Sequence, residues 1–470
     1  MDITLCTHNM TQFRERLYQN FANRADTLME LLDAICSMPD ARSVVEYSLA
    51  ACFRRSYSTI FKAINEMESS EKWLAQQIRP FLPRPRQWPF WLLMVDVTPA
   101  PRRYAPTLED RGMVYQPEVV KGKKPVTIGH QYSTVALGLE AEAGVTSSWV
   151  LPLLSGRVPT DKDKEMVGAQ QVDRLLADPQ LPFGRQLTVE VGDTSYSKPA
   201  YLHAHRKHSN LVSVGRVRGN RTFYHRYVAA DEEETERGHP TWYGAKFSLS
   251  DSESWKAADE TLSFGETSHK GKVYRVEMHA WHDMLMTGTY KPQRLCMNEY
   301  PFTLVRVVRY DAQGHCVCKR PLWLLVMGTR RHELNLRHIF QVYACRFNLE
   351  HFFRFGKQKL LLADFQTPEV EREEKWWHLV HIAYAQLWMA RHIAHALPRP
   401  WQRNLPHMKR RLISPTLVQR DFARIIRQLG TPAQPPKHRT ISPGRSPGTV
   451  LPKRPRHKVV VKSQITPHPT

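Results

Sequence analysis

The sequence has no long apolar run. Its longest apolar stretches, such as Phe90–Val95, are far shorter than the roughly 18 residues that a transmembrane helix needs. The first residues show no basic region followed by an apolar one, so we expect no secretory signal. Both absences disfavour a membrane protein, and we expect a cytoplasmic protein without a membrane partner.

Cysteine is scarce as well, with seven in 470 residues. An odd number spread along the chain does not describe a disulfide framework, so reduced thiols are the simpler interpretation. The one close pair, Cys316-Val-Cys318, is one residue shorter than the CxxC spacing of a zinc site and has no second pair beside it. A structural zinc site is therefore disfavoured.

Acidic residues are fewer than basic ones, with 45 Asp and Glu against 67 Lys and Arg, which gives a net charge of +22. Such a charge indicates a polyanionic partner, and nucleic acid fits better than a membrane surface because no basic amphipathic segment adjoins a long apolar run. No acidic residue follows Asp421, and residues 431–470 hold eight Lys or Arg and nine Pro. That composition is typical of a disordered tail that attracts DNA.

Two aspartates each stand after an apolar segment that reads as a buried strand. Asp96 follows Phe90–Val95, and Asp193 follows the strand Leu187–Val191 and Gly192. The expected order of strand, strand, strand, helix and strand is that of a ribonuclease H-like fold, with an Asp closing the first and the fourth strand. Taken alone, either Asp is more simply explained as a helix N-cap or a turn residue.

A third candidate region is the segment Tyr343–Lys357. If it is a helix, Tyr343, Arg346, Glu350 and Lys357 fall within an arc of roughly 60°. One face then carries an aromatic ring, two cations and a single carboxylate. Arg346 and Glu350 alone also describe an ordinary solvated i,i+4 pair, which is worth a few tenths of a kcal/mol, on the order of 0.3.

The spacing Tyr-x2-Arg-x3-Glu-x6-Lys, with two aspartates upstream, resembles the signature of the DDE transposases of the insertion sequence four superfamily. The resemblance covers about residues 88–395 and implies a ribonuclease H-like core in which Asp96, Asp193 and Glu350 are the catalytic and metal-binding carboxylates. It also implies cut-and-paste transposition by a homodimer on double-stranded DNA, namely terminal inverted repeats and target DNA, in the prokaryotic nucleoid. Several better-known members carry an Arg directly after the second Asp, where this chain has Thr194.

These residue types suit phosphodiester transfer, in which two divalent ions about 3.5–4 Å apart activate the nucleophile and stabilise the leaving oxygen. The expected cofactor is Mg²⁺ or Mn²⁺, two ions per site, because Mg²⁺ is a hard cation that takes few protein oxygens. The cations Arg346 and Lys357 are expected to hold phosphates beside the scissile bond. Tyr343 is expected to contact a phosphate or to stack on a base.

We therefore expect an α/β fold: a ribonuclease H-like mixed sheet with helices on both faces, interrupted by a β-rich insertion and accompanied by an N-terminal helical domain. The insertion is expected because Glu350 lies 157 residues after Asp193 (350 − 193), too far for a minimal core. The expected parts are a helical domain at 1–85, the core at 88–214 and 316–397, the insertion at 215–315, a basic extension at 398–430 and a disordered basic tail at 431–470.

Within these parts, periodicity predicts further elements. Strands are expected at Val126–Leu139, Ser148–Leu154, Val273–His282, Phe302–Tyr310 and Leu322–Met327, and helices at Asp163–Leu176, Asn335–Lys357 and from Thr367-Pro368 to Ala396. The N-terminal helices either read DNA, in the manner of a helix-turn-helix, or cap the core.

Several alternatives stay open. The chain could be a catalytically inactive, transposase-derived DNA-binding protein, or a ribonuclease H-like nuclease that cuts without strand transfer. The acidic run Asp231–Glu236 is interpreted as a solvated loop, since consecutive like charges do not converge on one ion without strain. The histidine pairs His378/His381 and His392/His395 lack an accompanying Cys or carboxylate set and are interpreted as structural or solvent-facing.

Overall fold

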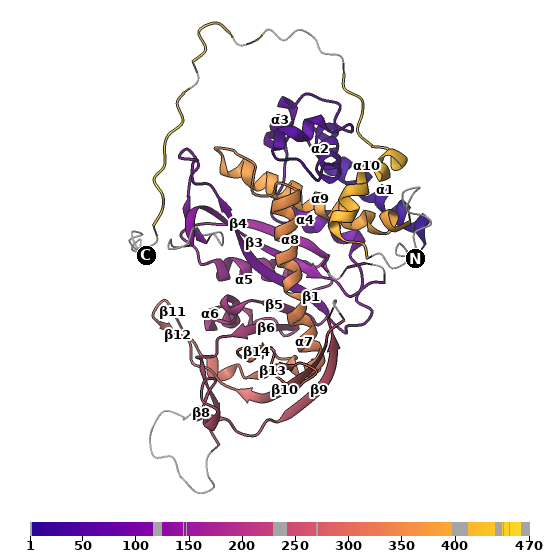
Figure 1. Ribbon diagram of the computed structural model, residues 1–470. Helices are drawn as coiled ribbons and strands as arrows, with labels where there is room; N and C mark the ends of the chain where they lie inside the picture. Colours follow the sequence, from indigo (N-terminus) through magenta and orange to yellow (C-terminus); the bar gives the residue numbers. More distant parts are fainter. Residues whose placement is uncertain are drawn as a thin grey trace. The chain divides into compact units, whose positions relative to one another are not determined.

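The structure is a computed structural model, and it describes residues 2–115, 125–143, 145–146, 148–228, 242–268, 271–396, 412–437, 444, 446–450 and 452–461. Figure 1 gives the arrangement of the elements. The helices are α1 Ile3–Asn20, α2 Ala25–Ser37, α3 Ser58–Glu66, α4 Trp73–Ile78, α5 Lys164–Ala177, α6 Pro199–His205, α7 Leu336–Cys345, α8 Phe347–Lys359, α9 Val370–Ala396 and α10 Pro415–Leu429. The strands are β1 Trp91–Pro101, β2 Gly112–Tyr115, β3 Val126–Gly138, β4 Val150–Val158, β5 Thr188–Gly192, β6 Leu211–Val217, β7 Thr222–Arg226, β8 Tyr243–Ser248, β9 Glu260–Thr267, β10 Val273–Met284, β11 Thr289–Tyr290, β12 Gln293–Arg294, β13 Phe302–Tyr310 and β14 Leu322–Met327.

The chain divides into two compact units. The first unit takes Met1–Arg84, Val97–Lys164 and Asn348–Thr470, and the second takes Pro85–Asp96 and Glu165–Phe347. Strand β1 passes from the second unit into the first between Asp96 and Val97. This division does not follow the six expected parts, whose boundaries stay predictions.

Ten strands form one mixed sheet in the order β2-β3-β1-β5-β6-β14-β13-β10-β9, with β4 paired to β3. Strand β5 lies between β1 and β6 and is parallel to both, whereas β6, β14, β13, β10 and β9 follow one another in antiparallel pairs. The expected α/β class with a mixed sheet is confirmed, and this sheet is consistent with a ribonuclease H-like fold. Strands β9, β10 and β13, which were expected in a β-rich insertion, extend this same sheet.

The strands whose bounds the sequence predicts well are those with mostly buried side chains. Every residue of β5 is buried, as expected for a parallel strand with a neighbouring strand on each edge. Strands β13 and β14 begin and end where they were predicted, because each is a short apolar run with mostly buried side chains. The first unit's β4 begins two residues later and ends four residues later than expected.

The first unit is organised around α9. Trp376, Trp377 and Tyr384 on this helix are fully buried, and α1, α2 and α10 pack against it (Figure 1). A helix that is apolar on all sides must be covered on all sides, which is what these neighbours do. The packing of α1 and α2 favours the interpretation of the N-terminal helices as a cap, while a role in reading DNA stays a prediction.

Helix α10 was not predicted, although it lies in the expected basic extension. Ser414 caps its N-terminus, since its Oγ accepts from Leu417 N at 3.4 Å, and Pro415 occupies the first turn. Gly430 ends the helix with a φ of 77°. These capping residues could be recognised in the sequence. The apolar periodicity of the helix was harder to recognise, because five Arg and Gln residues lie between the caps.

The histidine predictions agree with the structure where it describes them. His378 and His381 are buried in the first unit. The His378 ring contacts Ser69 Oγ and Ser155 O, and the His381 ring contacts Trp377 O. His392 contacts Glu142 at 2.7 Å, and the His395 side chain lies outside the described residues. The acidic run Asp231–Glu236 also lies outside them. No helix of the described segments is long and apolar enough to cross a bilayer.

The described part of the basic tail includes two backbone hydrogen bonds within the first unit. His457 N donates to Pro106 O and Val460 N donates to Arg111 O, each at 2.8 Å. Residues 438–443, 445, 451 and 462–470 of the expected tail are outside the described residues.

Candidate active site

The two aspartates lie at matching positions in the second unit, Asp96 within β1 and Asp193 directly after the neighbouring parallel strand β5. The register of β1 and β5 runs from Trp91 opposite Thr188 to Met94 opposite Val191. Continuing it by two residues brings Asp96 opposite Asp193. Since neighbouring strands lie about 4.8 Å apart, the two carboxylates leave the backbone at adjacent points.

The strand-end position predicted for Asp96 needs a correction. Strand β1 continues past Asp96 to Pro101, so this Asp stands within the strand. What ends beside it is the partner strand, because β5 stops at Gly192. Beyond that point β1 runs along β3 in the first unit, where Arg102 N donates to Ile128 O at 2.8 Å. Gly129 permits this approach, since a Cβ there would lie 2.2 Å from Ala100 O.

Asp193 also has the simpler role that its type suggested. Its Oδ1 accepts from Ser195 N at 2.7 Å and caps the short 3-10 helix Thr194–Ser197. A carboxylate offers about four lone-pair positions on two oxygens, so this one bond leaves most of its acceptor capacity. Capping and metal binding are therefore compatible at Asp193, and the cap fixes the orientation of the carboxyl group.

Tyr196 belongs to this neighbourhood and was not anticipated. Its side chain is 3% exposed, and its hydroxyl has no hydrogen-bond partner among the described residues. Burial raises the pKa of Tyr196 well above its usual range, and the nearby carboxylates of Asp96 and Asp193 raise it further. Gly192 makes room for this side chain, since a Cβ at that position would lie 2.6 Å from the Cβ of Tyr196 and 2.8 Å from its ring. A Gly directly before a candidate Asp was the one available signal.

Arg216 is a second residue that sequence reasoning missed. Gly192 of β5 pairs with Gly215 of β6, so the next residue along, Arg216, lies beside the position of Asp193. Its side chain is exposed. Burial raises the pKa of Tyr343. The positive charges of Arg346 and Arg216 lower this pKa, and the negative charge of Asp193 raises it. The tyrosine and these charges thus share one region of the second unit.

Strand β5 itself carries a buried carboxylate with a structural role. Glu190 is 1% exposed and accepts from the hydroxyls of Tyr201, at 2.5 Å, and Ser213, at 2.9 Å. Tyr201 belongs to α6, so these bonds hold that helix to the sheet on the strand that leads to Asp193. Burial raises the pKa of the Tyr201 hydroxyl, and the carboxylate beside it raises it further.

The helix predicted over Asn335–Lys357 is two helices. Asn335 caps α7 by accepting from His338 N at 2.8 Å, as its type suggests. The interruption falls at Arg346, whose N–H donates to Tyr343 O three residues back, so a tight 3-10 type turn replaces the α-helical bond. Uninterrupted apolar periodicity does not reveal such a turn.

The four residues of the spacing pattern divide between the units. In the second unit Tyr343 is 4% and Arg346 7% exposed, and the guanidinium lies 4.5 Å from the Phe347 ring centroid and 5.8 Å from that of Tyr343. In the first unit Glu350 is exposed, and Lys357 is half-buried with its Nζ donating to Pro99 O at 2.7 Å. Their roles as a shared DNA-facing surface stay a prediction.

The donor set suits a hard divalent cation. Asp96 and Asp193 provide carboxylate oxygens from adjacent strands, the ligand type that Mg²⁺ prefers. Within the part of the chain that the structure describes, no three His, Cys, Asp or Glu side chains gather as metal ligands. The two aspartates are thus the part of the predicted metal site that the strand register brings together.

Comparison with known proteins identifies the family. The sequence profile described as DDE superfamily endonuclease matches residues 16–288, more than half of the chain, and this match includes Asp96, Asp193 and Arg216. It ends before Tyr343, so it carries no information on the spacing pattern or on a subfamily. Among curated proteins none matches the chain. The chain belongs to the DDE superfamily of endonucleases, which comprises nucleases and transposases that act on DNA.

Proposed function

We propose that this protein is a DDE transposase of the insertion sequence four type, which cleaves DNA at the ends of its element and joins the freed ends to target DNA. The observation that carries the proposal is the register of β1 and β5, which sets Asp96 opposite Asp193 within the matched family region. The spacing Tyr-x2-Arg-x3-Glu-x6-Lys supports Glu350 as the third carboxylate.

In this mechanism Asp96, Asp193 and Glu350 would hold divalent metal through carboxylate oxygens. Mg²⁺ or Mn²⁺, when bound, activates the attacking oxygen and neutralises charge on the leaving one. Asp193 is held for this by its cap on Ser195 N. Because one carboxylate oxygen makes that bond, it restricts the rotation of the carboxyl group and leaves the other oxygen to bind metal.

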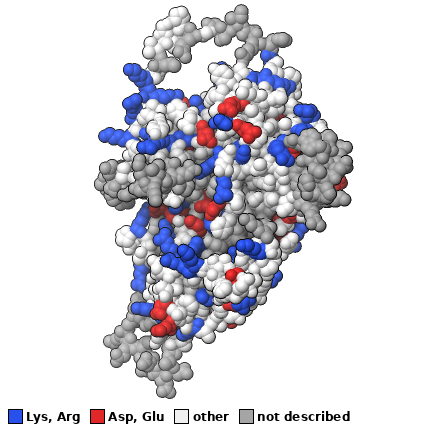
Figure 2. Space-filling model, viewed as in Figure 1, with Lys and Arg blue, Asp and Glu red and all other residues white. Residues whose placement is uncertain are grey.

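The cations of the site would act on the DNA strand. Arg216 and Arg346 belong to the second unit, and either guanidinium suits a phosphate because its N–H groups match two phosphate oxygens. Tyr343 would contact a phosphate or stack on a base. Basic side chains also outnumber acidic ones on the visible face in Figure 2, in line with the net charge of +22 and with a polyanionic substrate.

Further features of the proposal come from the resemblance. The protein would act as a homodimer that pairs two terminal inverted repeats, in the prokaryotic nucleoid. Thr194 stands where several relatives carry an Arg, and Arg216 on the neighbouring strand is a candidate to supply that missing positive charge.

The test is cleavage of a duplex that carries the DNA flanking this gene, with Mg²⁺ as the metal. Asp96→Asn, Asp193→Asn and Glu350→Gln should each abolish cleavage and retain DNA affinity, whereas Glu15→Gln on α1, an exposed glutamate, should change neither. A second product, in which the cut end is joined to target DNA, separates a transposase from a nuclease that only cuts. DNA binding without cleavage by the wild type would support the inactive DNA-binding alternative instead.

A further inference from the structure

Two cations fasten the end of strand β1 to the helix α8 region of the first unit. Lys357 Nζ on α8 donates to Pro99 O of β1 at 2.7 Å. Arg102, directly after β1, donates from Nη1 to Ala363 O at 2.6 Å and from Nη2 to Phe365 O at 3.0 Å, and both carbonyls follow α8. Three hydrogen bonds therefore tie β1 to α8 and to the segment behind it.

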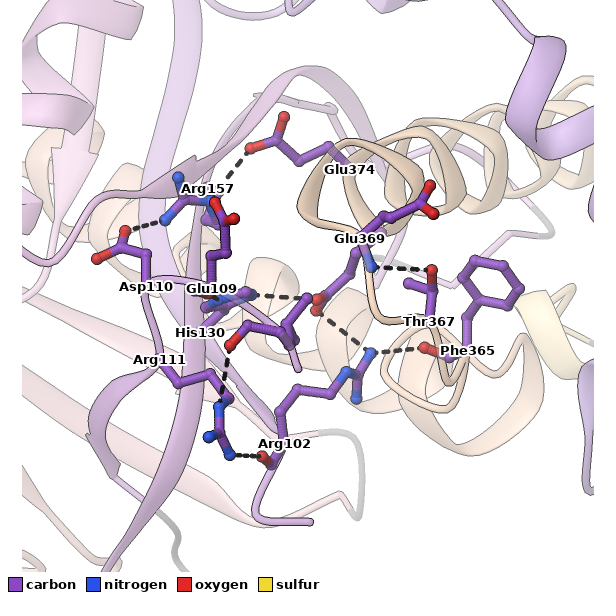
Figure 3. Close-up of polar contacts among 12 residues, drawn as sticks. Arg102, Glu109, Asp110, Arg111, His130, Arg157, Phe365, Thr367, Glu369 and Glu374 are labelled. Carbon is purple, nitrogen blue, oxygen red and sulfur yellow. Dashed lines mark hydrogen bonds and ion pairs between the residues drawn. The ribbon is translucent and has the colours of Figure 1, made fainter. Parts of the chain in front are cut away.

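Arg102 is itself held in place by a buried network, shown in Figure 3. Its guanidinium lies 3.2 Å from Glu373 Oε1 on α9, and both side chains are fully buried. Glu373 also contacts His130 Nδ1 on β3 at 3.1 Å, and the other ring nitrogen of His130 lies 2.8 Å from Glu109 O. A buried guanidinium needs a paired carboxylate and hydrogen-bond acceptors. The network supplies the carboxylate and an acceptor for each terminal nitrogen, while Nε has no hydrogen-bond partner among the described residues.

Lys357 is directed towards the protein rather than towards solvent. Burial lowers the pKa of its ammonium group to about 8, and the carboxylate of Asp364 partly opposes this. Burying part of a charge to bond one backbone carbonyl is energetically unfavourable. The position of the ammonium group is therefore not explained by stability. The bond directs this ammonium group to the end of β1, whereas the spacing pattern predicted that it holds a DNA phosphate.

We propose that Lys357 and Arg102 are positioning residues for DNA cleavage, which lock α8 to β1 and so hold Glu350 at a fixed place relative to that strand. Asp96 lies on β1 three residues before Pro99, and Glu350 lies on α8 seven residues before Lys357. This inference rests on the proposed function, since it names how one of its carboxylates is kept in place. A displacement of about 1 Å in a catalytic group can lower a rate by about 100-fold.

The experiment compares Lys357→Met and Lys357→Arg in the full-length chain, with Lys359→Met as the matched control. Lys359 is on the same helix and also donates to a proline carbonyl, Pro39 O, at 3.3 Å, but that residue is not on β1. The probe is the duplex with the gene-flanking sequence. Three quantities are measured: DNA affinity as a function of salt, the single-turnover cleavage rate at saturating DNA, and the Mg²⁺ concentration that gives half of the maximal rate.

If the inference is right, Lys357→Met lowers the cleavage rate by about 10- to 100-fold and raises the Mg²⁺ requirement, while DNA affinity and its salt dependence stay unchanged. Lys357→Arg, which keeps a cationic donor, recovers part of the rate, and Lys359→Met behaves as the wild type. Weaker DNA binding, with a salt slope reduced by about one and an unchanged rate at saturation, would identify a phosphate contact and overturn the inference.

Hydrogen exchange separates failure of this inference from failure of the proposed function. Removing the Lys357 bond should speed amide exchange in α8 and at the end of β1, whatever reaction the protein performs. A wild type without Mg²⁺-dependent cleavage overturns the proposed function, and with it a positioning role in cleavage, even if exchange shows that the lock exists. If the wild type cleaves DNA and amide exchange in Lys357→Met equals that of the wild type, the lock is refuted and the proposed function is not.

Discussion

Replacing Lys357 with methionine should leave the free energy of unfolding unchanged at pH 7 or raise it by up to about 2 kcal/mol. Burial lowers the pKa of this ammonium from 10.5 to about 8, and the drop of about 2.5 units means that the charge destabilises the folded state by roughly 3 kcal/mol. Losing the bond to Pro99 O costs about 1–3 kcal/mol, depending on whether the carbonyl finds another donor. Methionine has a similar length and no charge to desolvate.

The pH dependence of the free energy of unfolding provides a second, independent test of the charge on Lys357. Below pH 8 the ammonium is charged in both the folded and the unfolded state. Between about pH 8 and 10.5 only the unfolded state keeps the proton, so the stability of the wild type rises with pH across this window. The methionine variant lacks this contribution. The wild type should therefore gain roughly 2–3 kcal/mol relative to Lys357→Met between pH 7 and pH 10.

Denaturant unfolding of both proteins at pH 7 and pH 10 measures these differences, with Lys359→Met as the control. A loss of more than about 1 kcal/mol in Lys357→Met at pH 7, with no change in the difference between the proteins at pH 10, would refute the reasoning. Lys357 would then stabilise the fold by an ordinary hydrogen bond, and its retention would need no role in cleavage.

Three further changes test other parts of the structure. Arg216→Gln should weaken DNA binding and reduce the salt slope of the affinity by about one, since one phosphate contact is lost, and an unchanged slope would remove Arg216 from the DNA surface. Tyr201→Phe should lower the free energy of unfolding by about 1.5–3 kcal/mol, because buried Glu190 loses a donor; a loss below about 0.5 kcal/mol by denaturant unfolding would contradict that role. Arg102→Lys should destabilise the protein by about 3 kcal/mol, since an ammonium cannot reach Ala363 O, Phe365 O and Glu373 together, and a thermal midpoint equal to that of the wild type would argue against the network in Figure 3.

Elements with strong local signals were predictable. Strands β13 and β14 are short apolar runs, and their bounds match the prediction. Helix α9 follows Thr367-Pro368 and carries apolar residues on all sides, so its existence was clear, but its place at the centre of the first unit was not. The turn at Arg346 escaped prediction because a single 3-10 bond leaves the apolar periodicity intact on both sides.

The candidate site was predicted in part. Asp96 and Asp193 were selected because each follows an apolar segment, and both belong to the matched family region. Tyr196 and Arg216 were missed because each stands in a segment without a distinctive pattern. Arg216 becomes relevant only once β6 is known to pair with β5, and Tyr196 only once Gly192 is known to leave space for its ring.

The sequence by itself determined the residue types of this site, the basic character that favours DNA and the apolar segments that became strands, since these depend on composition and local periodicity. The tertiary structure alone decided which residues meet. Strand register sets Asp96 opposite Asp193 across an offset of 97 residues (193 − 96), and the burial of side chains on the faces of the sheet, which depends on the whole fold, fixes such a register. It also decided that the ammonium of Lys357 bonds Pro99 O, 258 residues earlier in the chain, because only folding brings the end of β1 beside α8.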